Sequence, residues 1–327
     1  MMSGYDSFTS CFAPFIESMI KEKRNAGFQY EHAEWILHKF DEFCNQGQVK
    51  TPVITQELAG RWGTLRKTET KVTLAGRISV LRQLSLYMQA YGIKCYVPRN
   101  FTRKGKHIAY VLSIEEIQSL FLEIDSYQPA INAEVYHRLA LEYRILFRML
   151  FCCGLRVSEA RKLRLDMVDL EKGVLKIYQS KGSNDRLVYL PDDLRQLCCE
   201  YLKIMTVKYK IRSEWFFPAS DPAKVLQVAS IGKRFHRAWE QTPYAREGVL
   251  QPTVHSLRHT FVVLRMNEWM KSGVKLDNMM PYLSKYLGHS SPADTFYYYH
   301  QVEEAFSIIK QKDQSVSFVI PEVADEK

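Results

Sequence analysis

Apolar residues in the first hundred positions recur at spacings of three and four, the periodicity of helices with one buried face. Thr55 has the right chemistry to cap a short helix, and residues 70–91 predict a longer one that stops at Gly92. We therefore expect residues 1–97 to form a small four-helix domain. The positions that carry the pattern in the first two helices are Phe12, Phe15, Ile16, Met19, Ile20, Ala33, Ile36, Leu37, Phe40 and Cys44.

The periodicity breaks over residues 98–112, where Pro98 and Gly105 interrupt the chain. Basic residues crowd into this stretch, which suits contact with a phosphate backbone. We interpret it as an extended basic linker between two domains, with an ordinary surface loop as the alternative. Its basic residues are Arg99, Arg103, Lys104 and Lys106.

Helical periodicity resumes at Ser113, which stands three residues before Glu116 in the spacing of a capping box. A strongly apolar helix follows over 135–153 and ends at Gly154. The second domain is expected to span 113–302, followed by a C-terminal helix or tail over 303–327.

A short β-rich interval interrupts the second domain. Val174–Ser180 and Arg186–Leu190 are β-branched and alternating, so they predict a hairpin, and the chain returns to helices over 192–300. The fold class is therefore mainly α with a small β-hairpin or sheet, of the α+β type.

The 327 residues carry a net charge of +9, and both domains and the linker are basic while the tail is acidic. Such a balance fits a polyanionic partner, although a solvated basic surface accounts for it equally well. In the first domain, Lys71, Arg77 and Arg82 are candidates for contact with a DNA backbone.

The seven cysteines include no CxxC spacing, which argues for reduced thiols and against a metal site. No apolar stretch is long enough to span a membrane, and the N-terminus has no export signal. We therefore expect a cytoplasmic protein that is associated with the nucleoid when bound to DNA.

Chemically capable residues gather in four short patterns of the second domain. Cys-Gly-Leu-Arg-Val-Ser-Glu places Arg156 and Glu159 after a helix-ending glycine, and Lys181 stands at the tip of the predicted hairpin. The pattern His-Ser-Leu-Arg-His puts three side chains on one helix face, and Leu-Gly-His precedes three consecutive tyrosines. The residues of these last two patterns are His255, Arg258, His259, His289, Tyr297, Tyr298 and Tyr299.

Two arginines, a lysine, imidazoles and a phenol together suit phosphoryl transfer to tyrosine. The sequence has no carboxylate cluster for Mg²⁺ and no glycine-rich loop ending in Lys-Ser or Lys-Thr for a nucleoside triphosphate. We therefore expect a reaction without metal, cofactor or ATP.

In order and spacing, these patterns resemble the signature of the tyrosine recombinase (phage integrase) family over residues 113–302. Residues 1–97 are more loosely similar to the helical core-binding domain of that family. The resemblance implies a site-specific DNA recombinase that cleaves and rejoins DNA through a 3′-phosphotyrosine intermediate.

The resemblance also implies roles for individual residues. Arg156 and Arg258 clamp the scissile phosphate, and Lys181 protonates the departing 5′ oxygen. His255 assists proton transfer at the tyrosine, and His289 hydrogen-bonds a phosphate oxygen. Glu159 supports the active site; His259, although inside the motif, is expected to pack or to bond to backbone.

Tyr298 is the preferred nucleophile because it follows His289 by nine residues and precedes His300 by two. Tyr297 and Tyr299 remain as alternatives. Because the phosphotyrosine ester stores the energy of the broken bond, rejoining needs no ATP.

The 30 residues between Arg258 and His289 make this interval longer than in compact chromosome-resolution recombinases, and 277–289 looks like recombinases of mobile elements. This favours integration or transposition. Double-stranded DNA is the expected partner, with a tetramer in the synaptic complex and room for an accessory recombinase or a directionality protein. The tail over 303–327 docks either on its own domain or on a neighbouring protomer.

Two other functions remain open on sequence alone. A topoisomerase of type IB uses nearly the same residues to nick and close DNA. A non-catalytic DNA-binding protein can keep the fold, although all the expected positions here hold chemically competent residues. The sequence does not identify the target DNA site.

Overall fold

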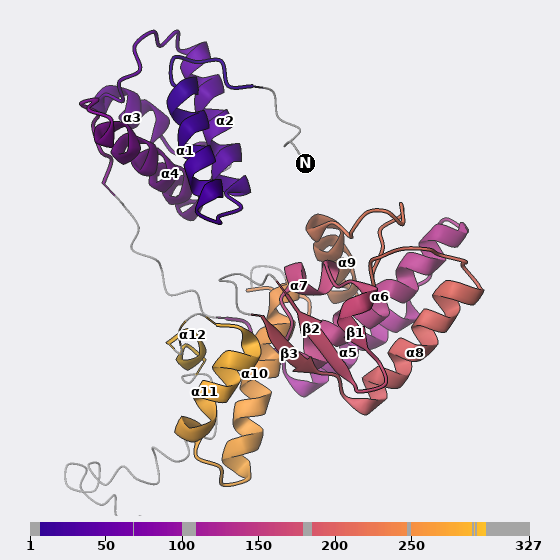
Figure 1. The fold of residues 1–327 in the computed structure, drawn as a ribbon. Coiled ribbons are helices and arrows are strands. Elements are labelled where there is room, and N and C mark those ends of the chain that lie inside the picture. Colours follow the sequence, from indigo (N-terminus) through magenta and orange to yellow (C-terminus); the bar gives the residue numbers. More distant parts are fainter. Residues whose placement is uncertain are drawn as a thin grey trace, which may run out of the picture. The chain divides into compact units, whose positions relative to one another are not determined.

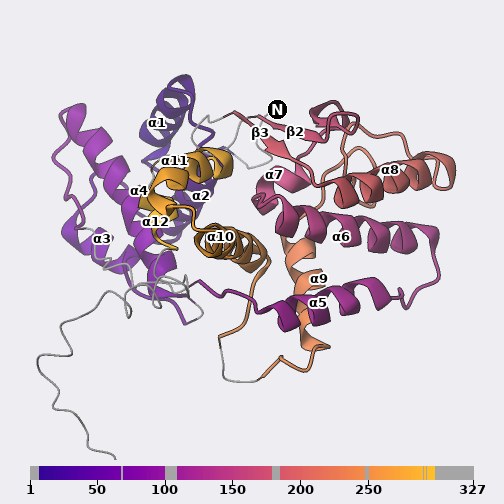
Figure 2. The ribbon, with the colours of Figure 1, turned by 90° about the horizontal axis from the view of Figure 1, so that it is seen from below.

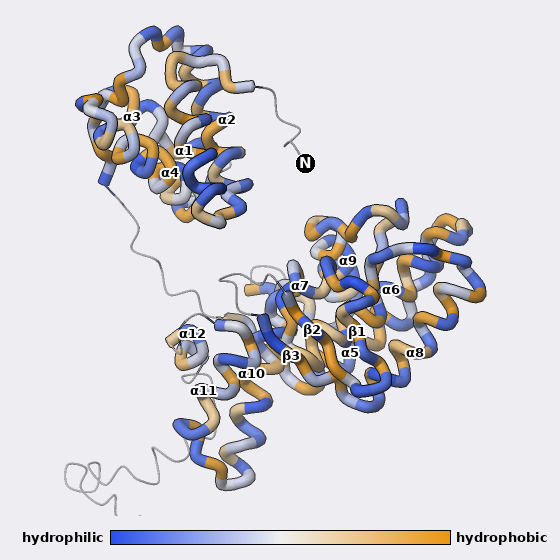
Figure 3. Tube along the Cα trace, viewed as in Figure 1, coloured by the Kyte–Doolittle hydropathy of each residue, from blue (hydrophilic) through white to orange (hydrophobic). Residues whose placement is uncertain are grey.

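The computed structural model describes residues 7–67, 69–99, 109–178, 185–246, 250–289, 291 and 293–298. The chain divides into two compact units, Met1–His107 and Ile108–Lys327, each with its own hydrophobic core. In both units hydrophobic and hydrophilic residues alternate along the helices (Figure 3). The expectations for Arg103, Lys104, Lys106, Lys181 and the tail lie outside the described residues.

The described part of the first unit contains the four expected helices (Figure 1). The side chain of Thr55 accepts a hydrogen bond from the Leu58 amide and so caps the third helix as predicted. The longest helix ends at Ala90, two residues before Gly92. The helices are α1 (Ala13–Asn25), α2 (Glu31–Gln46), α3 (Gln56–Trp62) and α4 (Lys71–Ala90).

Arg77, which we expected to meet DNA, is instead a buried structural residue. Its side chain is 4% exposed, donates to both carboxylate oxygens of Glu69 at 2.6 and 2.7 Å, and also donates to the Trp62 carbonyl. Its guanidinium carbon lies 4.6 Å from the Trp62 ring centroid. The prediction was wrong because helical periodicity places Arg77 on the inner face of α4, where Glu69 neutralises it.

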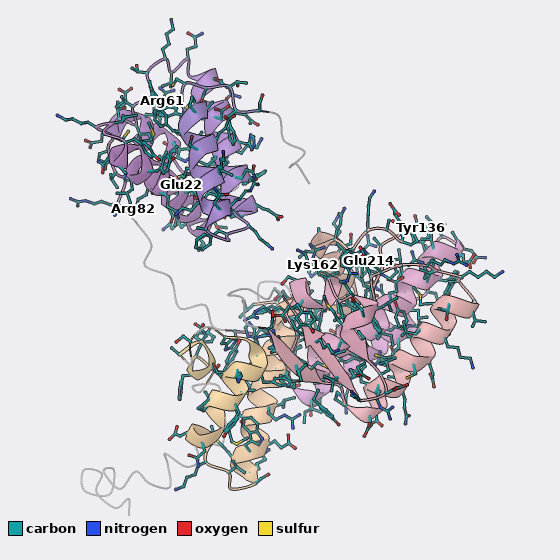
Figure 4. The ribbon with its side chains drawn as sticks, viewed as in Figure 1. Glu22, Arg61, Arg82, Tyr136, Lys162 and Glu214 are labelled. Carbon is teal, nitrogen blue, oxygen red and sulfur yellow. The ribbon has the colours of Figure 1, made fainter. Side chains whose placement is uncertain are left out.

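The other backbone candidates of this unit lie nearer the solvent. Lys71 is exposed at the first residue of α4, and Arg99 is exposed at the end of the described segment. Arg82 donates to the carbonyl of Pro98 at 2.9 Å and lies where the chain leaves the unit (Figure 4). These three side chains remain candidates for DNA contact.

The second unit is mainly helical with a small antiparallel sheet (Figure 1). The elements before the sheet are α5 (Ile114–Ser126), α6 (Glu134–Cys152), α7 (Val157–Arg161) and the 3-10 helix η1 (Leu165–Met167). The strands are β1 (Val168–Asp169), β2 (Val174–Ile177) and β3 (Arg186–Tyr189). The helices after the sheet are α8 (Asp192–Val207), α9 (Val228–Glu240), α10 (Val254–Lys271), α11 (Leu276–Leu287) and α12 (Ala293–Phe296).

The predicted hairpin is confirmed as β2 and β3, which pair antiparallel with Leu175 opposite Val188. The two-residue strand β1, too short to leave a pattern in the sequence, completes the order β1-β2-β3. Helix α6 lies between this sheet and α5 (Figure 2). The mostly helical interpretation of 192–300 needs one correction, since residues 208–227 form a loop that Phe216 and Phe217 anchor in the core.

The start of the domain carries the predicted cap of α5 and a contact with α10. Ser113 and Glu116 form the predicted capping box at α5, with both reciprocal hydrogen bonds present. Just before it, the amide of Leu112 donates to the hydroxyl of Thr260 at 2.9 Å. The helix that carries the His-Ser-Leu-Arg-His motif is therefore tied to the first residues of the unit.

Gly154 ends α6 in a left-handed conformation, φ +62°, and lies against α10. A Cβ at this position would come 2.5 Å from Cδ1 of Phe261. Both the backbone and the packing therefore require glycine.

We predict that Gly154→Ala destabilises the protein by about 2 to 4 kcal/mol, the sum of left-handed strain and overpacking. Urea unfolding followed by circular dichroism measures this. Gly232→Ala is the matched control, because Gly232 lies within α9 and its Cβ would meet nothing within 4 Å. The control is expected to be neutral or slightly stabilising, and equal effects of the two changes would contradict this account.

Candidate active site

The site is built around the buried carboxylate of Glu159, in the short helix α7. Glu159 Oε2 accepts from the amide of Arg156 at 2.8 Å, and Oε1 accepts from the Arg156 guanidinium at 2.8 Å. Arg156 is the N-cap of α7, and the Glu159 side chain accepts from its amide, which is the glutamate half of a capping box. This local geometry explains why the motif needs a glutamate three residues after the arginine.

Arg186 is a member of the site that we did not predict. Its guanidinium, 4% exposed, donates to Glu159 Oε1 and Oε2 at 2.9 and 2.8 Å and to the Tyr286 carbonyl at 2.6 Å. The one sequence signal is its place on β3, two residues from the buried Val188 and therefore on the same face. A charged residue on an inward face requires a partner, but the sequence does not say which one.

The pKa of Glu159 is lowered. Burial raises it, but hydrogen bonds and charge from Arg186 and the hydrogen bonds from Arg156 outweigh burial. The carboxylate is therefore ionised at neutral pH and holds the arginines in place.

Gly288, the middle residue of the Leu-Gly-His motif, joins these elements to the end of α11. It adopts φ +65°, and its carbonyl accepts from Arg156 Nη2 at 2.8 Å. A Cβ there would come 2.8 Å from Nη1 of Arg186. The glycine allows the arginines to approach the backbone directly before His289.

Arg258 is 2% exposed and lies on α10. It donates to the carbonyls of Gly154 and Leu287, each at 2.7 Å, and lies 4.0 Å from Glu159. Burial and the neighbouring charge of Arg156 lower its pKa to about 10, so it stays charged at neutral pH. The Arg258 guanidinium thus joins α10 to Gly154, which lies 104 positions earlier in the chain.

His289 accepts a hydrogen bond from Arg258 through Nε2, at 3.1 Å, because a guanidinium can only donate. Its Nδ1 therefore carries the proton of the neutral ring and donates to Thr295 Oγ1 at 2.6 Å. Burial, Arg258 and Arg156 lower the pKa of His289 to about 4. The imidazole is neutral at physiological pH, in one tautomer.

Tyr298 is 4% exposed and its hydroxyl lies 2.6 Å from Nδ1 of His259. Burial raises its pKa to about 12, although the charge of Arg258 acts in the opposite direction. This contact corrects our expectation that His259 packs or bonds to backbone. The His255 ring stands edge-on to His259, with centroids 4.4 Å apart.

The structure therefore brings together Arg156, Glu159, Arg258, His289 and Tyr298 through a continuous set of contacts. His255 adjoins them through His259. Tyr297 is 37% exposed and its ring packs on that of Tyr298, whereas Tyr299 and His300 are outside the described residues.

No cluster of histidine, cysteine, aspartate or glutamate suited to a metal occurs among the described residues. In the same part of the chain, no helix is both long and apolar enough to cross a membrane. Arginine donors beside a tyrosine oxygen form an environment in which an oxyanion such as a phosphate is stabilised.

The sequence of this chain is similar to a known protein family and to a curated relative. The model of the phage integrase family matches residues 114–305. A putative integrase/recombinase, y4rB, of Sinorhizobium fredii is 29% identical over 301 residues, which cover 88% of this chain and 92% of that protein.

Two solved structures share the fold. The XerH site-specific recombinase bound to a palindromic difH substrate aligns with a TM-score of 0.62 at 21% identity, over 91% of this chain and 83% of XerH. The Tn1549 transposon integrase in complex with transposon right end DNA aligns with a TM-score of 0.61 at 15% identity, over 91% and 99%.

We predict that Glu159→Gln destabilises the protein by about 3 to 5 kcal/mol at pH 7, because it leaves buried guanidiniums without their anion. The pKa of Glu159 is lowered by folding, so its contribution is present above the unfolded pKa and is lost as pH falls through the folded one. The difference in the free energy of unfolding between Glu159→Gln and wild type should therefore be smaller at pH 3 than at pH 7. Urea unfolding at both pH values measures it.

Glu214→Gln is the control for this experiment. Glu214 pairs with Arg164 at the surface of the second unit, where an ion pair contributes at most about 1 kcal/mol (Figure 4). A difference for Glu159→Gln that stays the same at pH 7 and pH 3 would contradict an electrostatic role.

Proposed function

The chain belongs to the phage integrase family, and from this membership we propose that Tyr298 is the residue that becomes joined to DNA. The chain is a site-specific DNA recombinase, a tyrosine-type enzyme that breaks and rejoins DNA. The observation that carries the proposal is that Tyr298 is buried, with its hydroxyl 2.6 Å from His259 and with the charge of Arg258 acting to lower its pKa.

In the proposed reaction, the oxygen of Tyr298 attacks the scissile phosphorus, the bond to the 5′ oxygen breaks, and a 3′-phosphotyrosine forms. Arg156 and Arg258 bind the non-bridging oxygens and stabilise the charge at phosphorus. Lys181 protonates the departing 5′ oxygen, and Glu159 holds the arginines. Rejoining is the reverse attack by a 5′ hydroxyl.

In the proposed complex, DNA changes the hydrogen bond between Arg258 and His289 and the protonation of His289. His289 Nε2 accepts from Arg258, so it has no proton to give a phosphate oxygen in this tautomer. An anionic phosphate offsets the arginine charges that keep His289 neutral, and it accepts the Arg258 donor in its place. We propose that His289 then donates a hydrogen bond to the phosphate.

DNA is contacted by both units in this proposal, with the basic linker between them. The proposed contacts with the DNA backbone come from Lys71, Arg82, Arg99, Arg103, Lys104 and Lys106. Arg77 is not among them, because it is buried. The active complex on two DNA sites is a tetramer. We propose that the chain is an integrase of a mobile element, and the long interval before His289 supports this proposal.

A topoisomerase-like enzyme and a non-catalytic DNA-binding protein are not favoured. The matched family model spans the whole set of candidate residues from Arg156 to Tyr298, and y4rB covers both units. In addition, the described candidate residues of the second unit include paired arginines and a phenol hydrogen-bonded to an imidazole, a set that suits phosphoryl transfer.

The proposal predicts a covalent adduct on a nicked duplex that carries the binding site, first selected from random duplexes with the purified protein. Wild type and Tyr297→Phe should accumulate the adduct, and Tyr298→Phe should give none. Arg258→Ala should slow its formation by about 10²- to 10³-fold, as for loss of a transition-state donor. Denaturing gel electrophoresis measures the adduct. An adduct that persists in Tyr298→Phe would move the nucleophile to another residue.

Backbone contacts are tested by the salt dependence of affinity for the same duplex. Lys71→Ala and Arg99→Ala should each lower the slope of log K against log salt by about 0.9, the loss of one phosphate contact. Lys39→Ala is the control, because Lys39 pairs with Glu42 on α2. Equal slopes for all four proteins would remove Lys71 and Arg99 from the interface.

A further inference from the structure

Among the described residues, His259 has a side chain within hydrogen-bond distance of the Tyr298 hydroxyl. Its Nδ1 lies 2.6 Å from the hydroxyl of Tyr298, and the two ring centroids are 5.3 Å apart. His259 follows Arg258 directly on α10, so one turn of helix supplies both a donor for phosphate and a group at the nucleophile.

The direction of this hydrogen bond depends on the protonation of Tyr298 and on the tautomer of His259. Burial raises the pKa of Tyr298 to about 12, so the phenol keeps its proton at neutral pH. In the neutral tautomer of His259 that carries its proton on Nε2, the hydroxyl donates and Nδ1 accepts with its lone pair. Nδ1 is therefore already placed to receive the proton that the phenol loses when its oxygen bonds to phosphorus.

The other charged or titratable groups around Tyr298 act differently. Arg258 and Arg156 lower its pKa by charge alone, and Tyr297 and Asp294 raise it. His289 is already bonded to Arg258 and to the hydroxyl of Thr295.

His255, to which we gave the proton-transfer role from sequence, lies one helical turn before His259. The two rings meet edge to face at an interplanar angle of 81°. This contact suits a positioning role for His255, in which its ring limits the orientation of His259.

We propose that His259 is the general base and acid for Tyr298. As the bond between Tyr298 Oη and phosphorus forms, the phenol proton passes to Nδ1 of His259, while Lys181 gives its proton to the departing 5′ oxygen. In rejoining, the imidazolium returns the proton to the departing phenolate of Tyr298. The inference rests on the proposed nucleophile.

His259→Gln, on the nicked duplex described above, should slow adduct formation by about 10²- to 10⁴-fold, the usual contribution of general acid–base catalysis. The wild-type rate should rise with pH and level off once the imidazole is neutral. The variant has lost the internal base, so its rate should continue to rise as solvent hydroxide takes over. Single-turnover rates between pH 5.5 and 9.5 give both profiles.

A duplex with sulfur in place of the bridging 5′ oxygen distinguishes the proton transfer at Tyr298 from the proton transfer to the leaving group. A thiolate leaves without a proton, so this substrate should restore a Lys181→Ala variant and should not restore His259→Gln. Restoration of His259→Gln would assign His259 to the leaving group and overturn the inference.

His236→Gln is the matched control, since His236 is an exposed histidine of the same unit that pairs with Glu240. It should react as wild type does, and thermal unfolding should show that His259→Gln is folded. A folded His259→Gln with a rate within twofold of wild type and an unchanged pH profile would overturn the inference. In that case, loss of the adduct in Tyr298→Phe would still uphold the proposed nucleophile.

Discussion

The buried carboxylate of Glu159 is the interaction on which the site depends. Gathering guanidiniums away from water is costly, because each loses hydration and repels its neighbours. Glu159 receives two hydrogen bonds each from Arg156 and Arg186 and lies within ion-pair distance of Arg258. One carboxylate therefore holds three guanidiniums together, and the cluster keeps a net positive charge.

The excess of positive charge lowers the pKa values of both His289 and Tyr298. Together with burial, it holds His289 neutral, with its pKa lowered to about 4. Tyr298 is kept protonated by burial, with a pKa of about 12. For Tyr298, burial outweighs the charge of Arg258 and Arg156, so the phenol keeps its proton.

Backbone carbonyls matter as much as side chains in this arrangement. Arg258 bonds to the carbonyls of Gly154 and Leu287, and Arg156 bonds to that of Gly288. The glycines of both motifs are therefore structural requirements of the arginines. Arg258 thus joins the C-terminal ends of α6 and α11 through hydrogen bonds to their carbonyl groups. The same arginines therefore contribute to the stability of the domain and to the geometry of the site.

Much of this protein is decided by local sequence. Helical periodicity and the capping residues Thr55 and Ser113 place the helices, alternation places the hairpin, and motif spacing selects Arg156, Arg258, His289 and Tyr298. These features depend on neighbours within a few residues, so the sequence alone carries them. The tertiary structure decided that Arg77 is buried, that Arg186 completes the site, and that His259 reaches Tyr298. In each of these cases the partner lies beyond the range of local patterns, and only packing determines whether a charged or imidazole side chain meets solvent, an ion or a nucleophile.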